Sequence, residues 1–349
     1  MQVAVIGGSL AGLAAANVFH RLGISVTVFE KFPASFEKRG SSLGYVDVDL
    51  WEYLRGTRMI RFGKRASRSQ GAFFYGDLWQ YLYEGLPNDC VKFNRTITDL
   101  GNDRMRPTID GSVYDAVVIA DGGWSSLRQY VNGDKEPEYA GYTIWRAKVA
   151  LEHLRDFRGE GAYDSGQYFA IALHVPTCDG QHFIMGGVAV ETPESEVVRP
   201  QLGASRHTEI VPSSEEAALP DWFLPFVRQH FARHADGEVV RWLETCAAKG
   251  KITAQPLYEF MAEDVVRGRI IMIGDAAHMA SPRTAAGAHT GVLDAAALME
   301  AFSQHSGKEH IDEAIRAYEP GGKLRARQLY QRSKEVSRPL LTKRNGREL

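Results

Sequence analysis

The sequence lacks the patterns that indicate a disulfide scaffold, a metal site or a membrane span. Its three cysteines, Cys90, Cys178 and Cys246, lie far apart and form no CxxC or Cys/His spacing. No apolar run reaches the ~18 residues that a membrane span needs, and the apolar run near the N-terminus has no basic flank of a signal sequence. We therefore expect reduced thiols, a cytoplasmic location, no metal and no membrane span.

An excess of either charge is also missing. The formal net charge is −2, which gives no indication of a nucleic-acid partner. The 349 residues, 44% of them hydrophobic, suffice for one large domain or two of ordinary size. The composition therefore predicts a globular protein that binds a small molecule. It leaves the possibility of a homodimer open.

The N-terminal residues carry a dinucleotide-binding pattern. A short strand at 2–6 runs into GGSLAG at 7–12, which opens a helix to about Leu22, and a second strand at 24–29 closes on Glu30. The first glycine permits the tight turn, the last permits close packing of helix and strand, and the helix N-terminus faces a pyrophosphate. Ser9 replaces the usual middle glycine. An acid at position 30 favours FAD or NAD over NADP because it can accept hydrogen bonds from free ribose hydroxyls.

Two later strands also end on polar residues. The strand predicted at 114–120 is followed by Asp121 and Gly122, with Ser125 and Arg128 shortly after. The strand at 270–273 ends on Gly274 and Asp275. A parallel sheet places its ligand crevice outside the carboxyl ends of its strands, so we expect both ends to meet the glycine turn and Glu30 at one site.

Three motifs in this order resemble the single-component flavin monooxygenases of the para-hydroxybenzoate hydroxylase class. They are GGSLAG at 7–12, ADGGWSSLR at 120–128 and GDAAHMASPRTAAGAHTGVLDA at 274–295. Within that class GGSLAG, EPEYAGYTIWR at 136–146 and PRTAAG at 282–287 look like the dihydroxypyridine 3-hydroxylases. The resemblance implies bound FAD, NADH or NADPH as a transient co-substrate, and O₂. It also implies hydroxylation of a hydroxylated aromatic or N-heteroaromatic compound through a flavin C4a-hydroperoxide.

The resemblance further assigns roles to residues. Asp275 would bind the ribityl chain, Pro282 would lie beside the isoalloxazine, and Gly287 would face its pyrimidine edge, where a helix N-terminus stabilises negative charge on reduced flavin. His289 stands where many relatives have Asn. The residues implied to contact the cofactor are Gly7, Gly8, Ser9, Leu10, Ala11, Gly12, Glu30, Lys31, Arg39, Asp121, Gly122, Ser125, Arg128, Gly274, Asp275, Pro282, Ala286, Gly287, Ala288 and His289.

The predicted fold is α/β, with a Rossmann-like FAD-binding domain and a smaller antiparallel-sheet substrate domain. We expect FAD-binding segments at 1–75, 76–135 and 263–310, a substrate-covering sheet at 136–262, and C-terminal helices with a basic tail at 311–349. Predicted helices lie at 46–54, 77–86 and 222–235, with a helix at 311–337 broken at Pro320–Gly322. Predicted strands include 91–100, 105–109 and four apolar runs between 143 and 260.

Candidates for catalysis are His289, His278 and Tyr258, since a histidine of ordinary pKa can deprotonate a phenol. Candidates for substrate contact lie in the covering sheet: Tyr142, Trp145, Arg146, Tyr168 and His182. Core packing is the alternative for the aromatic side chains, and loop capping is the alternative for His278. Alternative functions are an FAD-dependent epoxidase, oxidase or dehydrogenase, or a flavin- or nucleotide-binding protein without turnover. A hydrolase has no support because no G-x-S-x-G elbow occurs.

Overall fold

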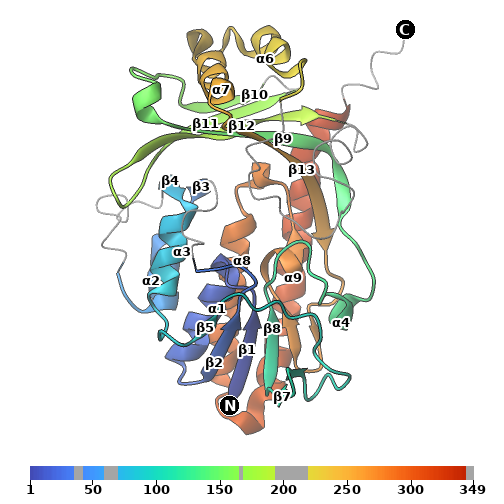
Figure 1. Cartoon of the computed structure of the whole chain (residues 1–349). Coiled ribbons are helices and arrows are strands. Elements are labelled where there is room, and N and C mark those ends of the chain that lie inside the picture. Colours follow the sequence, from blue (N-terminus) through green and yellow to red (C-terminus); the bar gives the residue numbers. More distant parts are fainter. Residues whose placement is uncertain (35–41, 59–69, 165–167, 193–218, 343–349) are drawn as a thin grey trace. The chain divides into compact units, whose positions relative to one another are not determined.

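The chain forms two compact units (Figure 1). The computed structural model describes residues 1–34, 42–58, 70–164, 168–192 and 219–342. Unit 1 comprises Met1–Gly71, Tyr75–Glu138 and Glu259–Lys334, and unit 2 comprises Ala72–Phe74, Tyr139–Tyr258 and Glu335–Leu349. Arg39, predicted to contact the cofactor, lies outside the described residues. Within the described ranges, no helix has the length and apolar character that crossing a membrane requires.

A six-stranded sheet forms the core of unit 1. Its strands are, in spatial order, β14 (Val266–Arg267), β15 (Ile270–Met272), β8 (Ala116–Ile119), β1 (Gln2–Ile6), β2 (Ser25–Phe29) and β5 (Val91–Lys92). β1 pairs in parallel with both β2 and β8, and β8 pairs in parallel with β15. These four strands therefore end at one edge of the sheet, which confirms the predicted convergence of Gly7, Glu30, Asp121 and Asp275.

Helices pack on this sheet and on one another. α1 (Leu10–Arg21) contacts β1 and β2 and also packs against α2 (Val48–Arg55), α3 (Tyr75–Tyr83) and α8 (Gly287–Gln304). The prediction of a helix at 46–54 is confirmed, and the Asp47 carboxylate caps it by accepting from the Leu50 amide at 3.1 Å. The stripe predicted on α3 is also confirmed, since Leu78, Tyr81 and Leu82 are all buried.

Short elements complete unit 1. They are β3 (Ser42–Tyr45), β4 (Gln70–Phe74, whose last three residues belong to unit 2), β6 (Thr108–Ile109), β7 (Ser112–Val113), α4 (Gln129–Asn132) and β16 (His278–Met279). The strands predicted at 91–100 and 105–109 are wrong in length, since only β5 and β6 form there. Asn94 adopts a left-handed φ of 57°, which interrupts the extended chain. Ile97 and Leu100 are buried at a spacing of three, so the alternation of a strand is absent.

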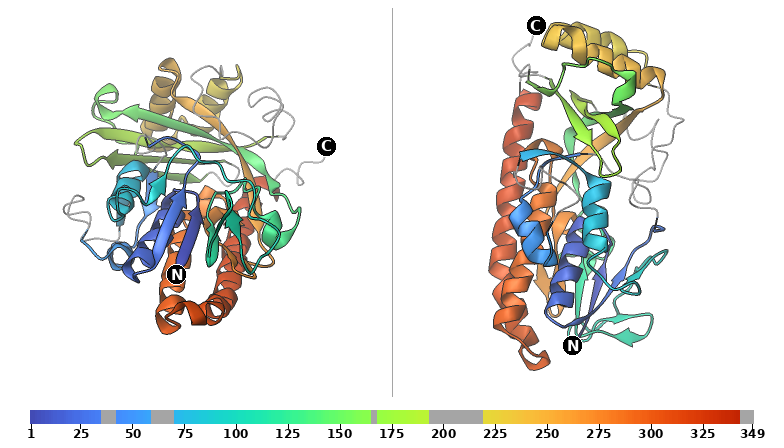
Figure 2. Two further views of the ribbon diagram at one scale, coloured as in Figure 1. Left: turned by 60° about the horizontal axis from the view of Figure 1, so that its bottom comes forward. Right: turned by 90° about the vertical axis from the view of Figure 1, so that its left-hand side faces the viewer.

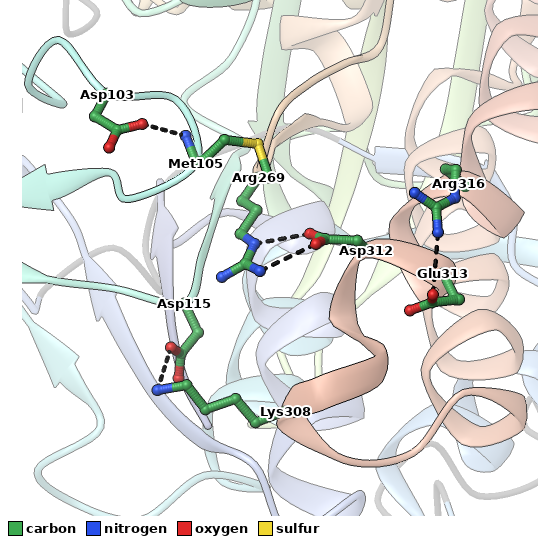
Figure 3. Close-up of polar contacts among 8 residues, drawn as sticks. All are labelled: Asp103, Met105, Asp115, Arg269, Lys308, Asp312, Glu313 and Arg316. Atoms are coloured by element: carbon green, nitrogen blue, oxygen red, sulfur yellow. Dashed lines mark hydrogen bonds and ion pairs between the residues drawn. The ribbon is translucent and has the colours of Figure 1, made fainter.

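The amino ends of the strands are tied down by surface ion pairs (Figure 3). Arg269, just before β15, donates to both carboxylate oxygens of Asp312 at 2.8 and 3.1 Å. Asp115, just before β8, accepts from the backbone amide of Gln2 at 2.8 Å and pairs with Lys308 at 2.7 Å. These contacts lie at the edge of the sheet opposite to the predicted site, so they serve the fold.

α9 (Ile311–Thr342) is one unbroken helix, and the predicted break at Pro320–Gly322 is therefore wrong (Figure 2). The glycine at 322 is explained by packing. A Cβ at Gly322 would lie 3.0 Å from Val265 and 3.1 Å from the Tyr318 ring, so the residue allows close approach. Ion pairs around the proline support the helix, since Lys323 contacts Asp264 and Glu319. Tertiary contacts thus override the local preference for a break.

Unit 2 is an antiparallel sheet with two helices on one face (Figure 1). Its strands β10 (Gly161–Asp164), β11 (Phe169–Pro176), β12 (His182–Glu191) and β9 (Glu138–Ala150) pair in that order, with β13 (Ile252–Met261) next to β9. The four predicted strands are confirmed. The helix predicted at 222–235 is shorter, α6 (Phe223–Phe231), and a second helix, α7 (Glu238–Ala248), was missed. Its buried Val239, Trp242, Leu243 and Cys246 show the helical spacing that indicates it.

Candidate functional site

The turn after β1 has the geometry that close approach to a ligand requires. Gly7 has a φ of +103°, and a Cβ there would lie 2.3 Å from the Ala120 carbonyl oxygen. A Cβ at Gly12 would lie 1.9 Å from the Gly7 carbonyl oxygen. The two glycines therefore let β1, α1 and the end of β8 meet with no side chain between them. Ser9 precedes the first residue of α1, and its Oγ lies 2.6 Å from the Tyr75 hydroxyl.

Glu30, at the end of β2, is buried against this turn. Its Oε2 accepts from the Gly8 amide at 2.6 Å and its Oε1 accepts from the Phe32 amide at 2.8 Å. The carboxylate is thereby held in one orientation, and each oxygen keeps a further lone pair for another donor. The carbonyl of Gly8 is also engaged, because the Trp79 indole donates to it at 2.7 Å.

Asp121, at the end of β8, has an unsatisfied carboxylate oxygen. Oδ1 of Asp121 and the hydroxyl of Ser125 are buried, and neither makes a hydrogen bond of normal geometry with a described residue, although Ser125 lies close enough to lower the pKa of Asp121. Burial raises the pKa of Asp121 to about 6, against the lowering effects of Ser125 and Arg128. A buried acceptor without a donor costs free energy. A hydroxylated ligand fits this position because it would supply the missing donor.

Arg128 links the segment after β8 to the turn after β15. Its guanidinium donates to the carbonyls of Ala276 at 3.0 Å and Gly123 at 2.8 Å, and it lies 3.7 Å from the centre of the Phe260 ring. Burial lowers the pKa of Arg128 to about 10, and Asp121 and Asp275 oppose this. Because its donors serve backbone carbonyls, Arg128 holds the two strand ends together.

The turn after β15 carries Asp275 toward the start of α8. Gly274 adopts a left-handed φ of 59°, and a Cβ there would lie 2.9 Å from the Ala11 Cβ, so the turn packs tightly on α1. The Asp275 side chain is exposed to solvent, yet dense surrounding protein raises its pKa, while His278 and Arg128 lower it. Oδ1 of Asp275 lies 3.9 Å from the position of a Cβ on Gly287. The carboxylate and the first amides of α8 are therefore neighbours.

A buried polar network that the sequence analysis missed fixes this turn. The Asp294 carboxylate, on α8, accepts from the Gly274 amide at 3.0 Å, from His278 Nε2 at 2.7 Å and from Arg325 Nε at 2.7 Å. Burial lowers the pKa of His278, but the Asp294 carboxylate outweighs this and the net pKa is raised. Burial raises the pKa of Asp294, but His278 and Arg325 outweigh it and the net pKa is lowered. Asp294 is an acid on an otherwise apolar face of α8, and this is the sequence feature that could have indicated the network.

The segment before α8 presents backbone amides. Ser281 caps the turn at Pro282–Thr284 by accepting from the Arg283 amide at 3.1 Å, and Ala285 adopts a left-handed φ of 51°. α8 then begins at Gly287, so the first amides of the helix, at Gly287, Ala288 and His289, have no acceptor within the helix. The N-terminus of a helix stabilises negative charge through these amides and the helix dipole.

His289 lies in the first turn of α8 with a free ring nitrogen. Its Nδ1 is buried without a hydrogen-bond partner among the described residues, and its ring packs edge-on against Tyr45 at 5.1 Å. Burial lowers the pKa of His289, and Asp47 opposes this. The imidazole is therefore neutral near pH 7 and has an accepting nitrogen available. His278 contacts Asp294 through Nε2, and its Nδ1 is likewise buried without a hydrogen-bond partner among the described residues.

The predicted substrate residues divide between the two faces of the unit 2 sheet. Trp145 packs on Trp222 and Phe223 of the helical layer, Tyr168 packs on Phe226 and His230, and His182 lies 2.9 Å from His174 on the same face. Trp145 and Tyr168 are therefore occupied by the helical layer, and His182 is occupied by His174. Tyr142 and Arg146 lie on the opposite face, because side chains alternate along β9. Tyr258 packs against Tyr139 at 5.4 Å.

Comparisons with known proteins agree with this geometry. Residues 114–333 match the model of the FAD binding domain family. The chain is similar to a 6-hydroxynicotinate 3-monooxygenase of Bordetella bronchiseptica, with 29% identity over 93% of this chain and 88% of the relative. It is also similar to a 2,6-dihydroxypyridine 3-monooxygenase of Paenarthrobacter nicotinovorans, with 25% identity over 87% of this chain and 83% of the relative.

Solved structures share the fold. The structure of 2,6-dihydroxypyridine-3-hydroxylase from Arthrobacter nicotinovorans superposes with a TM-score of 0.73 and 20% identity, covering 97% of this chain and 92% of that one. Klebsiella pneumoniae HpxO complexed with FAD and uric acid superposes with a TM-score of 0.71 and 18% identity, covering 99% and 90%. The fold and the four strand ends thus define an FAD-binding flavoprotein of the aromatic hydroxylase type. The chain belongs to the FAD binding domain family, and the resemblance predicted from its three motifs is confirmed.

Proposed function

We propose that this protein is an FAD-dependent monooxygenase that uses NADH or NADPH and O₂ to hydroxylate a hydroxylated aromatic or N-heteroaromatic compound. The observation that carries the proposal is the meeting of the glycine turn, Asp121, Asp275 and the start of α8 at one edge of the unit 1 sheet. The names of the relatives, which act on hydroxynicotinate and dihydroxypyridine, support the substrate class.

The residues of unit 1 fit FAD on structural grounds. The glycine turn brings the first amides of α1 to a pyrophosphate, and Glu30 offers its remaining lone pairs to ribose hydroxyls. Asp121 offers an unsatisfied buried acceptor to a hydroxylated ligand. We assign Asp275 to the ribityl hydroxyls, because it lies beside the start of α8 and its carboxylate is exposed. The bound flavin supplies electron transfer and oxygen activation.

The chain's own residues supply orientation, charge and proton transfer. The amides at the start of α8 stabilise negative charge at the nearby end of the flavin. His289 is assigned as the base that accepts the proton of the substrate hydroxyl, because its Nδ1 is free and its pKa is lowered. His278 and Arg128 are assigned as positioning residues, since their donors already serve Asp294 and backbone carbonyls.

The two units take different tasks in this proposal. Unit 1 holds the cofactor, and the sheet of unit 2 carries substrate contacts. Of the substrate residues predicted from sequence, Arg146 remains assigned. Trp145 and Tyr168 pack into the helical layer, and His182 pairs with His174. Tyr142 is fully buried, with its hydroxyl 3.2 Å from the Ser337 hydroxyl. The three cysteines are free thiols, which suits a reducing compartment such as the cytoplasm.

The test is a turnover assay with labelled oxygen. The purified protein is expected to show the yellow flavin spectrum and to oxidise NADH or NADPH faster when a hydroxypyridine or phenol is added. With ¹⁸O₂ the product gains one labelled oxygen atom and water takes the other. An unlabelled product with continued flavin reduction assigns an oxidase or dehydrogenase instead. Flavin binding without any stimulated oxidation assigns a binding protein without turnover.

A matched pair of variants tests whether His289 is the base that accepts the substrate proton. His289→Gln is expected to lower kcat by about 10²-fold or more at pH 7, since general base catalysis contributes about 10²- to 10⁴-fold. The loss should shrink as the pH rises toward the pKa of the substrate hydroxyl, because the substrate then ionises without help. His305→Gln, in the segment after α8, is the control and should leave the pH profile unchanged. An equal loss at every pH would contradict the role of a base.

A further inference from the structure

A buried carboxylate lies near the end of β13, beside the segment that leads to α8. β13 and β16 pair antiparallel through Phe260 and Met279, so Glu259, one residue earlier, lies beside the chain that follows β16. The Glu259 side chain is 1% exposed. A carboxylate removed from water costs free energy, and an apolar residue in such a place is often neutral or stabilising. Stability alone therefore does not explain an acid at this position.

Glu259 fixes the direction of a serine hydroxyl. The Ser333 hydroxyl, on α9, donates to Oε1 of Glu259, and Lys334 Nζ lies 2.8 Å from Oε2. A carboxylate paired with an ammonium group only accepts hydrogen bonds, so the hydroxyl proton of Ser333 points to Glu259. The hydroxyl oxygen then presents its lone pairs to the Ser281 amide, which donates to it at 2.7 Å. Ser333 is fully buried, so water does not compete for either contact.

The Ser281 amide is the first of a run of engaged amides in the turn 281–286. The amides that follow donate back into the turn: Arg283 to Oγ of Ser281 at 3.1 Å, Thr284 to the Ser281 carbonyl at 3.0 Å, Ala285 to the Pro282 carbonyl at 2.9 Å, and Ala286 to the Thr284 hydroxyl at 3.1 Å. Pro282 has no amide proton. The next amides belong to the start of α8 and have no acceptor within the helix.

The turn therefore transmits the position of Ser333 to the start of α8. Its own hydrogen bonds hold it as one unit, and Ser333 is where that unit meets α9. Hydride transfer from NADH or NADPH brings two electrons and one proton, which leaves one negative charge on the reduced flavin. Amides stabilise such a charge only when they are held pointing toward it.

We propose that Glu259 and Ser333 are positioning residues that hold the turn 281–286 so that the first amides of α8 face the flavin. They thereby set how strongly the bound flavin prefers its reduced state. Both residues act through Ser281 and do not touch the cofactor. This inference rests on the proposed function for the place of the flavin beside α8. It goes further by assigning the control of flavin reduction to side chains of β13 and α9.

The test compares three variants of the FAD-loaded full chain: Ser333→Ala, Glu259→Gln and the control Ser337→Ala. Ser333→Ala leaves the Ser281 amide without its acceptor. Glu259→Gln keeps an accepting oxygen but removes the charge that fixes the hydroxyl. Ser337 lies one turn further along α9, is also buried, and has its hydroxyl 3.2 Å from that of Tyr142. The two serine variants each remove one buried hydroxyl from the same helix, so they should lower the melting temperature by similar amounts.

The first measurement is the reduction potential of the bound FAD, determined by equilibration with a reference dye. Ser333→Ala should lower the preference for reduced over oxidised FAD by about tenfold, which is about 30 mV for a two-electron couple. Glu259→Gln should lower it by about threefold, because a neutral acceptor binds the hydroxyl more weakly. Ser337→Ala should change it by less than about twofold. A change below about twofold in either Ser333→Ala or Glu259→Gln, or an equal change in Ser337→Ala, overturns the proposal.

The second measurement is amide hydrogen exchange, which tests the contact at Ser281 directly. Peptides that cover residues 279–286 should exchange about tenfold faster in Ser333→Ala, because the Ser281 amide has lost its acceptor, and should be unchanged in Ser337→Ala. Faster exchange with an unchanged reduction potential would show that the contact serves the fold, and the proposal would fail.

The outcomes also separate this inference from the proposed function. If the potential shifts as expected but no hydroxylated aromatic compound stimulates oxidation of NADH or NADPH, the monooxygenase function fails and the positioning role stands. If such a compound is hydroxylated and the potential of Ser333→Ala equals that of the wild type, the function stands and the positioning role fails.

Discussion

The strand ends of unit 1 and the face of β9 that carries Arg146 in unit 2 use polar side chains in opposite ways. In unit 1 Glu30, Arg128 and Asp294 are buried and each makes two or more hydrogen bonds, mostly to backbone atoms. In unit 2 Arg146 makes none among the described residues. The first arrangement holds a shape that a large cofactor needs. The second leaves the donors of one guanidinium without a partner among the described residues.

The largest expected effect tests the shape of the glycine turn after β1. Gly12→Val should abolish FAD retention and destabilise the protein by about 3 kcal/mol or more, because the new side chain meets the Gly7 carbonyl oxygen, 1.9 Å from the position of a Cβ. FAD content after gel filtration and urea denaturation measure the two effects. Gly44→Ala is the control, since no atom lies within 4 Å of a Cβ there. Retention of FAD by Gly12→Val would contradict close approach at this turn.

The next prediction concerns the buried network of Asp294, His278 and Arg325 beside the turn after β15. Asp294→Asn should cost about 3–5 kcal/mol, because His278 and Arg325 lose the buried carboxylate that they share. FAD affinity should fall as well, since the Gly274 amide loses its acceptor and the turn that carries Asp275 is released. Urea denaturation and FAD titration are the measurements. Asp49→Asn, at an exposed position of α2, should change neither.

The same network predicts a pH dependence with a definite sign. The folded pKa of His278 is raised, so its contribution to stability is complete below its unfolded value of about 6.5 and is lost as the pH rises through the raised folded value. The folded pKa of Asp294 is lowered, so its contribution is present above about 3.9 and is lost as the pH falls through the lowered value. Unfolding free energies measured above pH 6.5 should fall in the wild type and stay level in His278→Gln.

Replacing Asp121 should change the stability of the cofactor-free protein and the affinity for FAD in opposite directions. Its folded pKa is about 6, above the unfolded value of about 3.9, so the protein without cofactor loses stability as the pH rises from about 4 to 6. Asp121→Asn should therefore stabilise that form at pH 7.5 by about 1–3 kcal/mol. It should also weaken FAD by about tenfold. A destabilised variant without cofactor would show that Asp121 serves the fold.

The smallest effect lies at the opposite edge of the sheet. Asp312→Asn should cost no more than about 1 kcal/mol, because the pair with Arg269 is partly exposed and water competes for it. The Arg269 guanidinium is the main cause that lowers the pKa of Asp312. Raising the salt concentration should remove most of the difference between variant and wild type. FAD affinity should be unchanged, and a change would contradict the separation of this edge from the site.

The sequence predicted the features that follow from local rules. The glycine turn, Glu30 and the acids at 121 and 275 each follow an apolar strand, and parallel pairing was enough to bring them together. It did not predict the partners of these residues. The family resemblance assigned Arg128 to the cofactor, whereas its guanidinium donates to carbonyls of the segment that follows β15.

Long-range contacts explain the remaining differences. Pro320 and two glycines indicated a break in α9, but packing against Val265 and ion pairs on either side sustain the helix. Asp294 and Arg325 meet only because α8 and α9 are neighbours, and no spacing in the sequence gives that information. The sequence did not indicate which face of β9 the helices α6 and α7 cover, so Trp145 and Arg146 were both assigned to the substrate although they lie on opposite faces.

The order of the strands in the unit 1 sheet has a consequence for synthesis on the ribosome. β8 lies between β1 and β15 in space, yet β15 is made roughly 260 residues after β1 ends, which takes about 13–50 s at ~5–20 residues per second. During that interval the parallel sheet has an unpaired edge. Residues 139–258 of unit 2 form one continuous stretch and emerge complete within it. The chain therefore makes most of unit 2 before the sheet of unit 1 can close, and it completes unit 2 only with residues 335–349.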